Sequence, residues 1–149
     1  MDARIAKLKT PQECEALAKN ALARDRPDLV MAAKRRAVQI RAENYGVNSD
    51  VERECIEAIF AYEEVLSAKT GKRKPAARTW PMIKRYGIIE AVEKIVSRKD
   101  DAPGYTALVE MGLAEYAFEA VILRHPSAFS AEAIERSKER LSFGSSSST

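Results

Sequence analysis

Apolar residues recur at intervals of three and four along most of this chain, and that spacing constrains its fold more than any other feature. The clearest stretch has intervals of four, four, three and four, through Val51, Cys55, Ile59, Tyr62 and Leu66. Such a rhythm places side chains on one face of an α-helix. No segment alternates with a period of two for long enough to predict a β-strand. The sequence therefore predicts an all-α protein.

Start and stop signals divide the chain into helices. Thr10 and Ser49 each lie three residues before a glutamate, which is the spacing of a capping box. Gly46, Gly71 and Gly87 each follow a stretch with helical periodicity, where glycine commonly ends a helix. These signals predict helices over residues 11–24, 27–44, 50–68, 76–86, 88–98, 105–111, 113–124 and 131–141. The helix over 76–86 can also begin nearer 79 or 80, because a proline at 81 fits only the first turn.

The order of these helices predicts a compact multi-helix domain of about seven or eight helices. The first two, separated by a short break at 24–27, should form an antiparallel hairpin. Later helices should pair at tight glycine corners, at Gly87 and Gly112. A chain of 149 residues suits one domain. We therefore expect a single domain over 1–142, with a turn at 100–104 and a flexible Gly/Ser tail over 143–149.

Three assignments of helix faces follow from the same periodicity. The first long helix should direct Leu17, Ala18, Ala21 and Leu22 inward. The helix over 50–68 should carry an acidic outer face, made of Glu52, Glu54, Glu57, Glu63 and Glu64. The helix over 113–124 should be buried on nearly all sides, because Glu119 is the one polar residue of 116–123.

Positive charge is concentrated in one segment. Between Ser67 and Ile89 there are seven basic residues and no acidic one: Lys69, Lys72, Arg73, Lys74, Arg78, Lys84 and Arg85. The whole chain has a net charge of only +3, so the other residues sum to a negative charge. A concentrated positive surface favours a polyanionic partner.

We expect this segment to bind nucleic acid, with DNA favoured over RNA. A basic loop over 72–74 can follow a phosphate backbone, and Arg78 and Arg85, seven residues apart, share a helix face. Trp80 could stack on an unpaired base or pack on a sugar. The next helix carries Glu90 and Glu93, so contact should be mainly with the backbone and weak in sequence preference. The expected binding residues are Lys69, Lys72, Arg73, Lys74, Arg78, Trp80, Lys84 and Arg85.

Two other interpretations remain open. The basic loop can lie back against the acidic helix before it, with Trp80 as a core residue that anchors the short helix. Alternatively, the chain is a helical interaction module for an acidic protein. Residues 10–44 resemble a tetratricopeptide-type helical hairpin, although the full signature of that repeat is absent and at least three repeats are normally needed.

The residues offer little for catalysis or for a cofactor. One histidine, His125, and two distant cysteines, Cys14 and Cys55, do not make a zinc site. No glycine-rich phosphate loop is present. Glu115 and Glu119 are four apart and could share a face, and an apolar setting could raise the pKa of Glu119. A partner such as Arg98 or Arg124 is the plainer role for that carboxylate, so we expect no catalytic residue, no metal and no cofactor.

The same sequence argues against a membrane protein. No apolar run approaches the roughly 18–20 residues that span a bilayer. The N-terminus begins with mixed charges and lacks the apolar stretch of a secretory signal. We therefore expect a cytoplasmic protein with reduced cysteines. The expected function is a non-catalytic nucleic-acid-binding helical module, accessory to a DNA-processing system.

Overall fold

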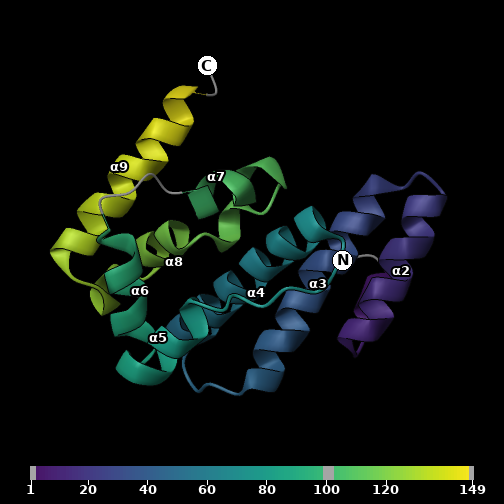
Figure 1. The fold of residues 1–149 in the computed structure, drawn as a ribbon, viewed down its shortest axis with the longest axis horizontal. Coiled ribbons are helices and arrows are strands. Elements are labelled where there is room, and N and C mark those ends of the chain that lie inside the picture. Colours follow the sequence, from purple (N-terminus) through teal and green to yellow (C-terminus); the bar gives the residue numbers. More distant parts are fainter. Residues whose placement is uncertain (1–2, 99–102, 148–149) are drawn as a thin grey trace. The chain divides into compact units, whose positions relative to one another are not determined.

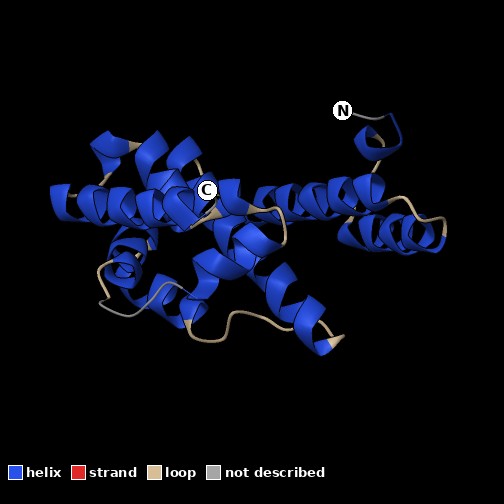
Figure 2. Cartoon of the chain, turned by 90° about the horizontal axis from the view of Figure 1, so that it is seen from above, coloured by secondary structure: helices blue, strands red, loops and turns tan. Residues whose placement is uncertain are grey.

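The computed structural model describes residues 3–98 and 103–147, and within them every regular element is a helix (Figures 1 and 2). This confirms the all-α prediction. Nine α-helices and two short 3₁₀ turns occupy the described ranges, close to the seven or eight helices expected. The chain forms two compact units, residues Met1–Val47 and Asn48–Thr149. The expected single domain over 1–142 stays a prediction.

The first unit contains α1 (Ala3–Ala6), α2 (Pro11–Ala23) and α3 (Pro27–Tyr45). Helices α2 and α3 pack against each other as the expected hairpin. The N-cap of α2 also forms as expected, because the Thr10 hydroxyl accepts the backbone N–H of Glu13 at 3.1 Å. Helix α1, which packs onto α3, was not predicted. The core of this unit consists of Ile5, Leu8, Cys14, Ala33, Ala37 and Ile40.

The assignment of Leu22 to the inner face of α2 was wrong. Its side chain is 72% exposed. The buried face of α2 centres on Cys14 and Ala21, which lie seven residues apart. Leu22 is one position further, a rotation of about 100° around the helix axis. It therefore lies beyond the edge of the face that α3 covers.

The second unit is built around α4, which runs from Asp50 to Thr70. Helices α6, α7 and α8 pack against α4, and α9 packs against α6 and α8. The other elements are α5 (Thr79–Tyr86), α6 (Ile88–Val96), α7 (Pro103–Glu110), η1 (Ala114–Tyr116), α8 (Phe118–Arg124), η2 (Pro126–Ala128) and α9 (Ala131–Ser147). Its core consists of Cys55, Ala58, Val92, Val96, Val121, Ile122, Phe129 and Ala133.

The continuous helix expected over 113–124 is broken. Ala117 has an extended backbone (φ −66°, ψ 146°) between η1 and α8. Neither glycine nor proline marks this position. The break lies among the buried side chains of Leu113, Tyr116 and Val121, so tertiary packing overrides the local helix preference.

The expected tail over 143–149 and the expected turn at 100–104 lie partly outside the described residues. Helix α9 continues to Ser147, through most of the stretch expected as a tail from 143, and residues 148–149 lie outside the described part. The turn expected at 100–104 falls mostly on residues 99–102, which are also outside it. Within the described residues, Gly104 already belongs to α7.

Candidate nucleic-acid interface

The basic segment lies on the last turn of α4, the loop over 71–78, and α5. All seven of its basic side chains are exposed. Two glycines shape the segment. Gly71 ends α4 in the left-handed conformation (φ 73°), and Gly87 turns α5 into α6 with φ 86° and ψ 166°. The start of α5 at Thr79 confirms that Pro81 lies in its first turn.

A buried carboxylate fixes the end of the loop. The Glu63 side chain accepts two hydrogen bonds at Oε2, from the Ala76 backbone N–H at 2.8 Å and from the Trp80 indole N–H at 2.6 Å. Its other oxygen, Oε1, lies 3.7 Å from Nη2 of Arg73. Glu63 is only 3% exposed. Placing it on an acidic outer face of α4 was therefore wrong, because this carboxylate faces the loop and α5.

Trp80 is placed as a packing residue. Its indole ring is half-buried and lies against Phe60, with ring centroids 5.2 Å apart and an interplanar angle of 54°. The backbone of the loop also contacts α4, since Lys74 N–H donates to the Ser67 hydroxyl at 3.0 Å. The loop thus lies back against α4, as the alternative interpretation expected. The contacts that hold it use its backbone and Trp80, and its lysines remain exposed.

Two further cations adjoin this segment at the α5–α6 corner. The Lys94 ammonium lies 4.6 Å from the centre of the Tyr86 ring, and the Arg85 guanidinium lies 5.2 Å from it. Arg98 reaches back to α5, with its Nη2 3.5 Å from the sulfur of Met82. Both Lys94 and Arg98 are exposed. The exposed cations of α6 therefore lie next to those of α5. Sequence reasoning did not assign Tyr86 a place at their centre.

Helices α6 and α9 cap each other. Glu93 of α6 accepts the Ser130 backbone N–H, at the start of α9, at 2.5 Å. In return Arg136 and Arg140 of α9 donate to the carbonyls of Ser97 and Arg98 at the end of α6, at 3.2 and 2.8 Å. These contacts satisfy helix ends that otherwise lack partners. One oxygen of Glu93 is thereby engaged at the start of α9.

Glu119 has a structural partner. Its Oε2 accepts from Nη1 of Arg140 at 2.8 Å, and both side chains are largely buried. The arginine that balances Glu119 is thus on α9, and it is neither Arg98 nor Arg124 as the sequence suggested. Because Arg140 also caps the C-terminal end of α6, the pair links α8, α9 and that end of α6.

The single histidine is part of a polar cluster around Glu54. Glu54 contacts His125 Nε2 at 2.5 Å and Arg124 Nε at 2.6 Å. Burial raises the pKa of Glu54, but the hydrogen bonds from His125 and Arg124 outweigh it, so that pKa lies below its ordinary value of 4.5. The neighbouring Cys55 is fully buried, which raises the pKa of its thiol to about 12. This cluster stabilises the contact between α4 and α8.

Within residues 3–98 and 103–147, no three metal-ligating side chains of His, Cys, Asp or Glu converge on one point. No described helix is both long enough and apolar enough to cross a bilayer. No family model, no curated protein and no solved structure matches the chain.

Proposed function

We propose that this protein is a non-catalytic nucleic-acid-binding module that contacts the backbone of duplex DNA through the loop over 71–78 and the α5–α6 corner. The observation that carries the proposal is the exposure of all seven cations of the segment while its backbone is tied to α4. Among the described residues, Arg73 is the one cation of the seven with an acidic partner. The other six are available to phosphates.

The surrounding charges support the same partner. Lys94 and Arg98 add to the basic surface, and Glu93 is engaged by the start of α9. Trp80 is packed against Phe60, so it is left out of the contact set, and recognition of unpaired bases loses its main candidate. Phosphate contacts carry little sequence information. The proposal includes a cytoplasmic location and an accessory role in a DNA-processing system. Both are inferred from the sequence alone.

A salt titration of binding to mixed-sequence duplex DNA tests the proposal. Each phosphate contact releases condensed counterions and contributes about −0.9 to the slope of log K against log salt. Four or five contacts predict a slope on the order of −4. Fluorescence anisotropy of a labelled duplex measures it. Absence of binding at low salt would exclude the proposal.

Charge reversal locates the surface. The variant K72E/R73E/K74E should abolish binding, because it replaces three cations of the loop. The matched control K9E/K19E/K138E changes the net charge equally at exposed lysines outside the segment. Control protein should bind with a similar salt slope. Equal losses in the two variants would show that net charge alone attracts DNA, which contradicts a defined interface.

The alternative is a helical protein-interaction module with an acidic partner. The same exposed cations favour it, and α2 and α3 form the hairpin that such modules use. Poly-glutamate distinguishes the two functions. A module for acidic proteins should bind poly-glutamate and DNA with similar affinity at equal charge. A DNA-binding module should prefer DNA, because its cations are spaced along a backbone-tied loop and a helix.

A further inference from the structure

The aromatic ring of Tyr86 contacts two cations that come from different helices. Arg85 and Tyr86 are the last two residues of α5, and Lys94 lies in the last turn of α6. The Arg85 guanidinium lies over the ring at 5.2 Å from its centre, and the Lys94 ammonium at 4.6 Å. Both distances fall within the reach of a cation–π interaction, about 6 Å. One half-buried ring thus gathers an exposed cation from each helix.

The backbone at the α5–α6 corner determines where this ring lies. The Gly87 N–H donates to the Ile83 carbonyl at 2.9 Å, and the Gly87 carbonyl accepts the Ala91 N–H at 3.1 Å. One residue therefore ends α5 and begins α6. Its φ of 86° is a conformation that glycine adopts without a steric cost. Because α5 and α6 also pack against each other, the ring and both cations are carried by helices and not by a loop.

Both cations keep hydrogen-bond donors for a ligand. A guanidinium carries its five N–H groups in its own plane, so contact with a ring leaves donors available at its edge. An ammonium has three N–H donors, and a ring on one side leaves the others. Among the described residues, no acidic side chain pairs with Arg85 or Lys94. Glu90, one helical turn before Lys94, is exposed, and Glu93 accepts the Ser130 N–H.

Contact with the ring lowers the cost of binding a phosphate. An exposed lysine or arginine loses rotamer freedom when it contacts a ligand, and this loss reduces affinity. A side chain that is already held against a ring has less freedom to lose. We propose that Tyr86 is a positioning residue of the DNA interface: its ring holds Arg85 and Lys94 where they contact backbone phosphates, and both cations stay on the ring when DNA is bound. This role rests on the proposed function.

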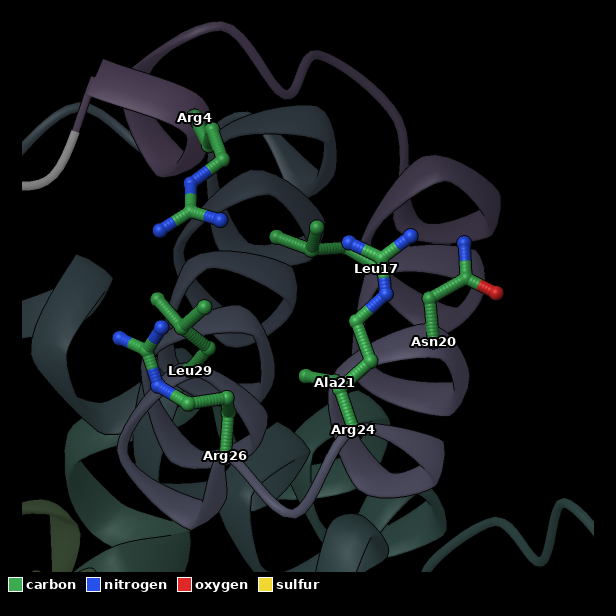
Figure 3. Close-up of a pocket in the computed structure, with 7 residues that line it drawn as sticks. All are labelled: Arg4, Leu17, Asn20, Ala21, Arg24, Arg26 and Leu29. Atoms are coloured by element: carbon green, nitrogen blue, oxygen red, sulfur yellow. The ribbon is translucent and has the colours of Figure 1, made fainter.

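The arginines of the first unit form no comparable arrangement. In Figure 3, Arg4, Arg24 and Arg26 lie around a pocket whose lining is mostly apolar. Arg26 donates to both carboxylate oxygens of Asp28, at 3.1 and 3.0 Å, so its charge already has a partner. The α5–α6 corner differs because its two ring-bound cations are exposed and have no acidic partner within the described residues.

Substitutions of Tyr86 separate positioning from direct contact. Tyr86→Leu removes the ring and should weaken binding to mixed-sequence duplex DNA about 3- to 10-fold. The salt slope should stay unchanged, because the number of phosphate contacts is the same. Tyr86→Phe keeps the ring and should bind within about twofold of wild type. Urea unfolding of each variant checks that it is folded at the temperature of the titration.

A double-mutant cycle shows whether the ring acts through the two cations. In the background R85Q/K94Q, Tyr86→Leu should change the affinity less than about twofold. Lys84→Gln is the matched control, because Lys84 is an exposed cation of α5 that does not contact the ring. In that background Tyr86→Leu should keep its full effect. An equal loss in both backgrounds, or a loss in Tyr86→Phe as large as in Tyr86→Leu, would overturn the proposal.

A measurement on wild-type protein needs no substitution at Tyr86. The ring current should move the NMR signals of the Lys94 side-chain protons next to the ammonium upfield of those of Lys84, and this shift should persist when duplex DNA is added. A Lys94 signal that moves to the Lys84 position on binding would show that the cation leaves the ring, which contradicts the proposed role. Absence of DNA binding by wild-type protein would instead remove the proposed function, and this role with it.

Discussion

The two oxygens of Glu63 have separate roles, and one substitution can remove one role while it keeps the other. Oε2 accepts both N–H groups that fix the loop and Trp80, while Oε1 faces Arg73. Glutamine keeps one carbonyl oxygen for the two N–H donors. Its amide nitrogen then takes the place of Oε1, since the reverse orientation would set an NH₂ group against two donors. Glu63→Gln should therefore preserve the loop and release Arg73.

The size of the effect follows from the exposure of the pair. Arg73 is 54% exposed, so its attraction to Glu63 is screened and worth about 0.2–1 kcal/mol. Releasing it should tighten DNA binding about 1.5- to 5-fold. One more phosphate contact should also steepen the salt slope by about 0.9. Anisotropy titrations of wild-type protein and Glu63→Gln at several salt concentrations measure both quantities.

Glu63→Ala provides the contrast. It removes the acceptor of two N–H groups, and each buried, unsatisfied donor costs about 1–3 kcal/mol. This variant should lose stability in urea and shift the fluorescence emission of Trp80, whereas Glu63→Gln should keep the wild-type spectrum. A glutamine variant that binds DNA no more tightly than wild type, or whose Trp80 emission moves as in the alanine variant, would refute the division of roles.

Three other predictions concern the second unit. Cys55 is buried, and its thiol has a pKa of about 12. It should therefore react with a thiol reagent at pH 8 at least about 1,000-fold more slowly than an exposed cysteine. A rapid reaction in the native state would contradict its burial. Gly87→Ala should cost about 1–3 kcal/mol in urea unfolding because φ 86° with ψ 166° suits glycine alone, whereas Gly71→Ala, in the left-handed region, should cost less. Glu54 has a lowered pKa in the folded state, so its contribution to stability is present above about pH 4.5 and is lost as the pH falls through the folded value. Glu54→Gln should flatten that acid loss in unfolding measured at pH 7 and pH 3.5, and an unchanged loss would exclude this cluster as its source.

Local signals predicted the helices because each acts within a few residues. The capping residues Thr10 and Ser49 bond to backbone groups three positions ahead, so spacing alone reveals them. Gly46 and Gly71 adopt the positive φ that ends a helix, again a local property. The break at Ala117 has no such signal, since it depends on side chains from other elements.

The sequence predicted the exposed cations of the candidate interface. It did not predict the Glu63 contacts that hold the loop and Trp80 in place. Exposure of lysines and arginines is their usual state, so counting them located the surface. Glu63 was misplaced because four other glutamates of α4 share its stretch of sequence, and periodicity cannot tell which one meets a loop from 13 residues away. Trp80, 17 residues from Glu63, decides that question through its indole N–H. Only a three-dimensional contact joins the two residues.

The charge on Glu63 has a consequence for binding. A neutral acceptor would satisfy Ala76 and Trp80 equally well, and burying a carboxylate costs free energy unless a cation compensates it. What the charge adds is attraction for the basic loop when no polyanion is present. DNA phosphates would offer Arg73 the same attraction at a more accessible place. Under the proposed function, Glu63 and DNA would therefore compete for one guanidinium, and this carboxylate would lower the affinity for DNA.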